Sequence, residues 1–516
     1  MTSLDPPSRG DKPFAALPDD PARAALVVLL AFTALRIAFA ALLGFGVDES
    51  YTLGQARHLA LSYFDHPPLH LWLAHLSMAL FGTSWAVRLP FIGLFAGTGW
   101  LLFLLTQRLF GGWAGVWAVL ALNASLFFLA SPGTWIVPDG PLLFFLAAGA
   151  LALARLVFPA EGEAPSPWTA WLVAGLCFGL AGLSKYSAVF VVAGLAVFLL
   201  ATGQRRWLLH PAPYAGALLA LLVVSPVIVW NLAHDWASLR FQAGRGGGRG
   251  LSPTAFAQML AGQFVWLAPW IAVPLATIAA TDLLRLADPR RLFLLALATP
   301  TIVYFTLQSL WSGWALPHWP MPGWFFVFPL LGAWMVANPL ASPSPRAWAA
   351  WSAALAVILA LGVGAIGASG LLTRLGVPVR ADPTVDALDW TALRPVLAAK
   401  GAAKGSGPVV VALTWNEGGK VDLAVGDRAD VTVIGPDPRG FAYRPVPRLF
   451  RDSDVLIVAL AGTFARQQGM LASQFAVIGE PERLAIGRGG RPELELVLVP
   501  ARGLKSLTPV SVAGLR

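Results

Sequence analysis

Residues 47–69 read VDESYTLGQARHLALSYFDHPPL, and the rest of the chain is best interpreted outward from this stretch. An apolar run ends at Phe45, Asp48 and Glu49 follow almost at once, and a second acid, Asp65, stands near the far end. Carboxylates beside a membrane surface must be solvated or paired, and such acids are usually functional. The alternative is that the first two acids only mark the point where a helix leaves the bilayer.

The composition is that of a membrane protein. Of its 516 residues, 57% are hydrophobic and only 12% are charged, whereas soluble domains carry about 25% charged residues. A membrane-spanning helix needs ~20 apolar residues. We therefore predict a polytopic α-helical membrane protein with about 11 transmembrane helices, at 23–46, 85–107, 112–130, 138–157, 168–184, 186–202, 211–231, 255–281, 291–310, 316–337 and 348–373.

The distribution of arginines predicts the orientation of these helices. Cytoplasmic loops of membrane proteins are enriched in Lys and Arg. A cytoplasmic N-terminus retains seven arginines on that side: Arg108, Arg205, Arg206, Arg285, Arg290, Arg291 and Arg346. Loops 47–84 and 232–254 and the C-terminal region then face outward, which in a Gram-negative bacterium is the periplasm. We expect a multi-pass protein of the inner membrane.

Three regions follow from the changes in composition. Residues 1–22 are polar and Pro-rich and predict a disordered cytoplasmic tail, and residues 23–374 form the transmembrane domain. Residues 375–516 predict a small exported α/β domain. Apolar strand-like runs at 408–414, 430–434 and 454–460 alternate there with helical segments near 385–400 and 463–474.

Charge and cysteine content exclude some classes of function. The net charge is +9, and a basic excess in a membrane protein first indicates anchoring of cytoplasmic loops. The basic residues are spread along the chain and not grouped in one patch, so we expect no nucleic-acid partner. The single cysteine, Cys177, permits neither an intramolecular disulfide nor a thiolate metal site.

Acids and bases gather on the outward side. Asp48 or Asp65 is placed to act as a general base, because group transfer needs a carboxylate near the nucleophile. Lys185 lies between two spans, where an unpaired ammonium is costly, so it should meet an anion. That anion is either a substrate phosphate or the carboxylate of Asp48 or Asp139, and Arg88 faces the same choice.

Loop 232–254 places Arg240, Arg245 and Arg249 among flexible glycines. Arginine matches phosphate oxygens with two parallel hydrogen bonds, and glycines let backbone N–H groups approach as well. The loop therefore predicts phosphate binding. A mobile basic loop that contacts anionic lipid headgroups is the alternative.

Three histidines raise the question of a metal. His66 and His70 are four residues apart, the spacing that places two side chains on one helix face, and His75 lies one residue beyond the ideal third position. Pro67 and Pro68 make a helix from His66 uncertain. We assign no metal ligands and no cofactor, with a divalent cation as the alternative.

Several short motifs together resemble a known family. They occur in order over about the first 320 residues: the Asp48-Glu49 pair, Pro67-Pro68-Leu69, Ala86-Val87-Arg88-Leu89-Pro90, Pro138-Asp139-Gly140, Gly182-Leu183-Ser184-Lys185-Tyr186, Trp230-Asn231 and His318-Trp319-Pro320. The pattern resembles bacterial membrane glycosyltransferases of family 39 and their aminoarabinose lipid A transferase relatives. These share the GT-C fold with protein O-mannosyltransferases.

The resemblance implies a polyprenyl-phosphate-sugar donor and an acceptor of the cell envelope on the exported side, either lipid A of lipopolysaccharide, another glycolipid or polysaccharide, or a protein. Transfer would proceed with inversion and without a nucleotide. Asp48 matches the family's catalytic acid, Glu49 is its usual neighbour, and Lys185 suits the donor phosphate. The aminoarabinose transferases typically have Glu-Lys where this chain has Asp65-His66, so its sugar and acceptor need not be theirs.

The predicted site is therefore as follows. The catalytic candidates are Asp48, Glu49 and Asp65, and the substrate-binding candidates are His66, Arg88, Asp139, Lys185, Tyr186, Arg240, Arg245 and His318. The alternative function is a polyprenyl-linked lipid flippase or transporter without transfer chemistry. A secondary transporter is expected to carry inverted repeats and charges near the bilayer midplane, whereas the polar residues here lie toward one face.

Overall fold

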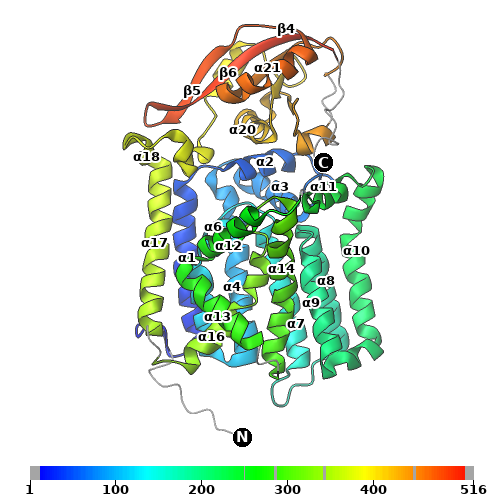
Figure 1. Cartoon of the computed structure of the whole chain (residues 1–516), viewed down its shortest axis with the longest axis vertical. Helices are drawn as coiled ribbons and strands as arrows, with labels where there is room; N and C mark the ends of the chain where they lie inside the picture. Colours follow the sequence, from blue (N-terminus) through cyan, green and yellow to red (C-terminus); the bar gives the residue numbers. More distant parts are fainter. Residues whose placement is uncertain (1–11, 249, 284–286, 341–343, 445–448, 506–516) are drawn as a thin grey trace.

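The computed structural model describes residues 12–248, 250–283, 287–340, 344–444 and 449–505. It consists of a helical bundle with a smaller α/β domain above one end (Figure 1). Outside the described residues lie Arg249 of the predicted phosphate-binding loop, Arg285 of the predicted cytoplasmic loops, the first eleven residues of the predicted tail and the last eleven of the C-terminal domain.

Seven helices in the described chain are long and apolar enough to cross a membrane. They are α1 (Pro21–Leu42), η1 with α4 (Trp85–Arg88 and Leu89–Phe110), α7 (Asp139–Val157), α8 (Pro167–Ser184), α10 (Pro211–Ala233), α14 (Pro289–Ser312) and α17 (Pro345–Ser369). Three bent pairs raise the number to ten if each pair is one span: α5 (Gly112–Ala124) with α6 (Leu126–Thr134), α9 (Ala188–Ala201) with η2 (Gly203–Leu209), and α12 (Pro253–Leu267) with α13 (Pro269–Leu283).

The predicted number of about 11 spans is therefore higher than the seven to ten found in the described residues. The difference is the predicted span 316–337, which folds as two short helices, α15 (Met321–Phe325) and α16 (Phe328–Ala337). Pro322 and Pro329 each lie at the start of one of these helices. Proline suits the first turn of a helix, where its missing N–H has no intrahelical acceptor, so each proline is placed to begin a new helix.

Residues 12–20 differ from the predicted disordered tail. Leu17 is buried, and α1 begins at Pro21. The Asp20 side chain accepts hydrogen bonds from Ala22 N at 2.8 Å and Arg23 N at 3.0 Å, which satisfies donors that a helix start leaves free. This part of the tail packs against the bundle.

Short helices cover the bundle at the end that faces the C-terminal domain. They are α2 (Val47–Ala56), α3 (Leu69–Phe81), α11 (Ala237–Gly246) and α18 (Leu371–Arg374). Figure 1 shows α2 lying between the bundle and helix α20 of the upper domain. The two loops predicted to share one face therefore do lie on the same side of the bundle.

The C-terminal domain contains a six-stranded sheet in the order β2-β1-β3-β6-β4, with β5 paired to β6. Its strands are β1 (Val409–Ala412), β2 (Val431–Val433), β3 (Val455–Leu460), β4 (Phe475–Ile478), β5 (Glu482–Arg488) and β6 (Arg491–Leu504), and its helices are α19 (Leu393–Ala399), α20 (Trp415–Val425) and α21 (Ala461–Gln474). Short 3-10 turns complete it: η3 (Val379–Ala381), η4 (Pro383–Ala387), η5 (Gly426–Arg428) and η6 (Arg439–Tyr443).

The three predicted strands are confirmed as β2, β1 and β3, which pair in parallel. Strands buried on both faces read as continuous apolar runs, which is why the sequence signal was clear there. The antiparallel strands β4 to β6 were not predicted. In β5 and residues 491–495 of β6, Ile486 is the one buried position and the others are exposed or partly buried, so no apolar run marks them.

The C-terminal domain rests on the membrane domain through close packing of α20 against α2. A Cβ on Gly419 would lie 2.7 Å from Tyr51 Cα, and a Cβ on Gly54 would lie 2.4 Å from Asp422 Oδ2. Glycine permits this approach because it has no Cβ. Arg57 Nη1 adds a hydrogen bond of 2.8 Å to the carbonyl of Asp422. Helix α2 is therefore held against the C-terminal domain.

Candidate functional site

A buried ion pair positions the start of α2. Arg88 donates from Nε to Glu49 Oε1 at 2.8 Å and from Nη2 to Glu49 Oε2 at 2.6 Å, and the two side chains are 1% and 3% exposed. Glu49 also accepts from Gly46 N at 3.2 Å and from Ile136 N at 3.2 Å. The pair therefore joins η1, the first turn of α2 and the turn before α7.

The remaining donors of Arg88 are also used. Nη1 donates to the carbonyls of Ala40 at 2.9 Å and Leu43 at 2.6 Å, and Nη2 donates to that of Gly44 at 2.8 Å. A guanidinium has five N–H donors, and all five now have acceptors. The structure leaves Arg88 no donor for the predicted substrate contact. Glu49, predicted as catalytic, has both oxygens engaged, so the geometry gives both residues a scaffolding position.

Asp48, the neighbour of Glu49, has a different environment. Its side chain is exposed to solvent, while the rest of the protein crowds it. This partial desolvation is the largest cause of a raised pKa for the Asp48 carboxyl, and Arg439 opposes the shift. Nearby Asp65 and Glu49 raise the pKa further. An accessible carboxylate with a raised pKa suits a general base.

The second predicted acid, Asp65, is 4% exposed. Tyr51 Oη donates to its Oδ1 at 3.2 Å, and Arg439 Nη1 lies 3.8 Å from its Oδ2, too far for a hydrogen bond. Burial is the largest cause of its raised pKa, which Arg439 lowers in turn. The Asp65 carboxylate is therefore close enough to raise the pKa of Asp48, but it is much less accessible to a substrate than Asp48 is.

The predicted histidines His66 and His318 lie together with His70 near Lys185. The rings of His66 and His70 meet edge to face with centroids 5.3 Å apart. Burial holds the pKa of both well below the usual range, and the charges of Lys185 and Arg245 also lower that of His66. Burial likewise lowers the pKa of His318 to about 4. These imidazoles are neutral at pH 7.

His75 lies apart from the other two histidines, with its Nδ1 2.9 Å from the carbonyl of Ala56. The three-histidine metal site that the spacing allowed is therefore not assembled. Over the described ranges, no group of three or more His, Cys, Asp or Glu side chains is placed to hold a metal ion.

Lys185 pairs with Asp139, as one of the sequence alternatives held. Its Nζ lies 2.9 Å from both carboxylate oxygens, and the two side chains are 12% and 5% exposed. Both residues are close enough to His318 to affect its pKa, and Lys185 also lowers the pKa of His66. Tyr186 Oη forms a 2.6 Å hydrogen bond with Ser238 Oγ and so attaches helix α11 to the bundle.

The basic loop differs from its predicted flexible form, because residues 237–246 form helix α11. Its first seven residues contain no glycine, and Leu239 N donates to Asn231 Oδ1 at 3.2 Å. Arg245 is half-buried, stands 4.8 Å from the Trp319 ring, and has its pKa lowered by burial to about 10. Arg240 is exposed on the same helix. The two predicted phosphate ligands therefore have different surroundings.

The C-terminal domain adds residues that the sequence analysis missed. The Arg439 guanidinium lies 3.7 Å from the Trp415 ring centroid and 3.4 Å from Asp437 Oδ2. Its backbone φ is +46°, a conformation that is uncommon for residues other than glycine and often marks functional sites. Gly440 N donates to Tyr51 Oη at 2.9 Å. The Asp-Pro-Arg-Gly sequence at 437–440 signals a turn, but nothing in it signals proximity to Asp48.

Aromatic rings join these parts. Phe64 stacks on Tyr443 with centroids 5.2 Å apart and contacts Phe241 at 4.6 Å. Trp230, at the end of α10, stacks on His234 at 4.1 Å. The first loop, α11 and the C-terminal domain therefore meet over one apolar contact. The face of the bundle next to the C-terminal domain holds one continuous cluster of an accessible acid, buried neutral imidazoles and several cations.

The family model for dolichyl-phosphate-mannose-protein mannosyltransferases matches residues 65–230. The lipid A galacturonosyltransferase RgtD of Rhizobium johnstonii is 28% identical over 57% of this chain and 63% of its own length. The undecaprenyl phosphate-alpha-4-amino-4-deoxy-L-arabinose arabinosyl transferase 2 of Sodalis glossinidius is 30% identical over 29% of this chain and 27% of its own length. The matches span less than two thirds of these relatives.

Among solved structures, ArnT from Cupriavidus metallidurans bound to undecaprenyl phosphate superposes with a TM-score of 0.62 and 16% identity, over 92% of this chain and 97% of ArnT. The apo form gives a TM-score of 0.60. These comparisons confirm the resemblance to GT-C membrane glycosyltransferases and the predicted polytopic GT-C-like fold with its small C-terminal domain. The chain is a multi-pass membrane protein.

The Arg88–Glu49 pair predicts a large loss of stability when its charge balance is broken. Glu49→Gln leaves a buried guanidinium without its counter-ion, which costs about 3–5 kcal/mol. We expect a clear fall in the melting temperature of the purified protein. The matched control is Glu163→Gln, whose carboxylate also binds an arginine with two hydrogen bonds but is 46% exposed.

Exposed ion pairs contribute about 0–1 kcal/mol, so the Glu163 variant should melt close to the parent. Equal melting temperatures for the two variants would show that the buried pair does not hold the loop.

Proposed function

We propose that this protein is a membrane glycosyltransferase that moves a sugar from a polyprenyl-phosphate carrier to an acceptor at the outer face of the bacterial inner membrane. One observation carries the proposal: accessible Asp48, with its raised pKa, stands in the same cluster as Arg245, Arg439 and Lys185. A proton acceptor beside cations is what sugar transfer from a phosphate carrier needs.

The reaction forms one bond and breaks another. The acceptor hydroxyl oxygen attacks the anomeric carbon, and its proton passes to the Asp48 carboxylate. The bond between the anomeric carbon and the phosphate oxygen breaks with its electron pair, and polyprenyl phosphate leaves. Attack from the side opposite the leaving group inverts the anomeric configuration.

Cations stabilise the leaving group because the phosphate gains negative charge as the bond breaks. Arg245 is half-buried against Trp319, where a charge interaction is screened less than in water. Lys185 uses two donors on Asp139, and an ammonium has three. These two residues are the proposed phosphate ligands, with His66 and His318 as neutral hydrogen-bonding partners.

One named relative is a lipid A galacturonosyltransferase, and the name of the other specifies an undecaprenyl-phosphate-linked aminoarabinose. On this basis we assign a lipid A-type glycolipid as the acceptor. Their two sugars differ in charge, since galacturonate carries a carboxylate and aminoarabinose an amine. His66 stands where the aminoarabinose transferases typically have a lysine, and its lowered pKa keeps it neutral. The sugar that this protein transfers therefore need not be aminoarabinose.

The orientation is tested by single cysteines in a Cys177→Ser background. We expect an impermeant maleimide to label Asp235→Cys in intact spheroplasts and to label Arg205→Cys only after lysis, because arginine-rich loops are retained in the cytoplasm. Arg205 precedes α10 and Asp235 follows it, so the two positions lie at opposite ends of this helix. The reverse labelling pattern would place the acidic cluster in the cytoplasm and exclude a periplasmic site.

The base is tested by Asp48→Asn, which removes the proton acceptor while keeping the side-chain size. Turnover should fall about 10²- to 10⁴-fold, the usual contribution of a positioned acid–base group, and donor binding should persist. The control Asp235→Asn changes another exposed acid in this region and has a positive φ that asparagine tolerates. Near-parent turnover of folded Asp48→Asn would remove Asp48 from the mechanism.

The pH profile adds a second measurement on the parent enzyme. A base acts only when ionised, so the rate falls as pH decreases through the Asp48 pKa. Because that pKa is raised, the decrease should have its midpoint above the ordinary value for aspartate. A rate that stays constant down to the ordinary aspartate range would contradict the assignment.

Phosphate contacts are tested by Arg245→Gln and Arg240→Gln on the same helix. Loss of the half-buried cation should weaken binding of a hydrolysis-resistant donor analogue by about tenfold, roughly one charge-assisted hydrogen bond, and lower the rate. The exposed Arg240 should matter less, because water screens its charge. Lys185→Met combined with Asp139→Asn removes the Lys185 ammonium without leaving the buried Asp139 carboxylate unpaired.

If Arg245→Gln and the double variant bind the analogue as tightly as the parent, these cations are structural and the polyprenyl-phosphate donor itself comes into question. Transfer by purified protein also separates the enzyme from the flippase alternative, which would move the carrier lipid without changing it.

A further inference from the structure

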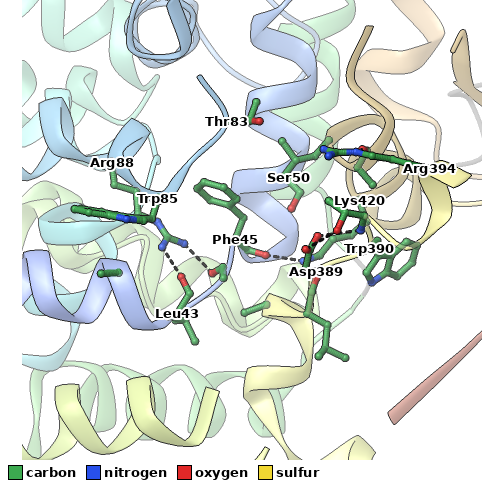
Figure 2. Close-up of a pocket in the computed structure, with 17 residues that line it drawn as sticks. Leu43, Phe45, Ser50, Thr83, Trp85, Arg88, Asp389, Trp390, Arg394 and Lys420 are labelled. Atoms are coloured by element: carbon green, nitrogen blue, oxygen red, sulfur yellow. Dashed lines mark hydrogen bonds between the residues drawn. The ribbon is translucent and has the colours of Figure 1, made fainter. Parts of the chain in front are cut away.

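A cavity lies at the junction between the membrane domain and the C-terminal domain. Its volume is about 270 Å³. Figure 2 shows Phe45, Ser50 and Trp85 on the membrane-domain side, with Arg394 and Lys420 entering from the C-terminal domain. None of the proposed reaction steps uses this cavity.

The cavity is separate from the proposed catalytic site. Ser50 lines it, while Asp48 lies two residues earlier on the same helix. Since an α-helix has 3.6 residues per turn, these two side chains point to nearly opposite sides of α2. A ligand in the cavity would therefore not contact the Asp48 carboxylate.

Lys420 is a buried cation with no carboxylate within ion-pair distance in the described chain. Its side chain is deeply buried, and its Nζ donates to the carbonyls of Phe45 at 2.5 Å and Leu388 at 3.1 Å. One N–H of the ammonium remains available. Burial lowers the pKa of Lys420 to about 8, which reflects the cost of a charge that no neighbour neutralises fully.

Arg394 supplies a second cation to the same cavity. Its Nε donates to the carbonyl of Ala424 at 2.5 Å, and among the described residues its two Nη atoms have no hydrogen-bond partner. A neighbouring cavity of about 370 Å³ shares Arg394, Thr83 and Leu423 with the first. The two cavities therefore adjoin along the domain junction, with the Arg394 side chain bordering both.

Acidic groups near the cavity are already engaged or lie at its edge. Asp389 lines it but is exposed, and its oxygens accept from Thr391 N at 2.9 Å and Oγ1 at 2.6 Å. Asp386 is exposed, and Glu49 is paired with Arg88. Arg88 also lines the cavity but has no free donor. The cavity thus offers N–H donors of two cations, and Asp389, the one carboxylate among the described residues that line it, is already hydrogen-bonded.

The position of the cavity corresponds to the level of lipid headgroups. It adjoins the end of α1 and the beginning of η1, where the chain leaves the apolar bundle. Trp85 is 40% exposed on its lining, and Leu80 and Phe81 beside it are also exposed. Exposed tryptophan at the end of a membrane helix is typical of the headgroup level of a bilayer.

We propose that this junction cavity binds the phosphate group of an anionic lipid headgroup from the outer leaflet, held by Arg394 and Lys420. Such a lipid would neutralise the two cations and bridge the C-terminal domain to the membrane surface. The proposal does not depend on glycosyl transfer, because the ligand lies on the opposite side of α2 from Asp48.

The test is titration of full-length protein in neutral detergent with fluorescently labelled phosphatidic acid, with labelled phosphatidylcholine as the zwitterionic control lipid. We expect saturable binding of phosphatidic acid only. Arg394→Gln should raise its Kd about tenfold, since it removes charge-assisted donors, and Arg394→Lys should recover part of the affinity. Arg502→Gln removes an arginine that is 75% exposed on β6 and should leave the Kd unchanged.

Arg394 is chosen because it is only half-buried, so its replacement is expected to leave the fold intact, as a melting curve would verify. An unchanged Kd in Arg394→Gln, or an equal loss in Arg394→Gln and Arg502→Gln, would overturn the site. Complete displacement of the lipid by an equimolar amount of inorganic phosphate would show a free-phosphate site and overturn the lipid assignment. None of these outcomes bears on the transfer reaction, which the Asp48 variants test separately.

Discussion

The buried pair of Arg88 and Glu49 is the interaction on which the face of the bundle next to the C-terminal domain depends. Arg88 binds three carbonyls at the end of α1 as well as the carboxylate, and Glu49 binds two backbone N–H groups. Burying these charges is costly unless every donor and acceptor is satisfied, and here they are. The pair therefore fixes where the chain turns out of the bundle, and so fixes the direction of Asp48, the residue before Glu49.

This constraint separates two adjacent acids by role. Glu49 is 3% exposed and fully bonded, so it acts through position, whereas Asp48 is exposed and has a raised pKa. Two neighbouring carboxylates thus differ in accessibility because successive residues on a helix point in different directions. The same geometry turns Ser50 toward the junction cavity, so one short helix serves two separate sites.

The C-terminal domain completes the site from above. Its helix α20 approaches α2 at glycine contacts, and its η6 segment brings Arg439 beside Asp65 and close enough to Asp48 to lower its pKa. Because Arg439 belongs to the C-terminal domain, the pKa values of Asp48 and Asp65 depend on how that domain is docked on the membrane domain. If the domain moved away, Asp48 would lose both a cation and much of its surrounding protein, and these changes act on its pKa in opposite directions.

Apolar run length determined the helical bundle, and continuous Val-rich runs determined strands β1 to β3, because both signals are local in sequence. The acids, histidines and Lys185 were also found from the sequence, since charged groups are few in such a chain. Tertiary structure alone decided that Lys185 pairs with Asp139 and that Arg439 and Trp415 face the first loop. Those outcomes depend on contacts between residues far apart in the chain, where no periodic pattern carries information about the partner.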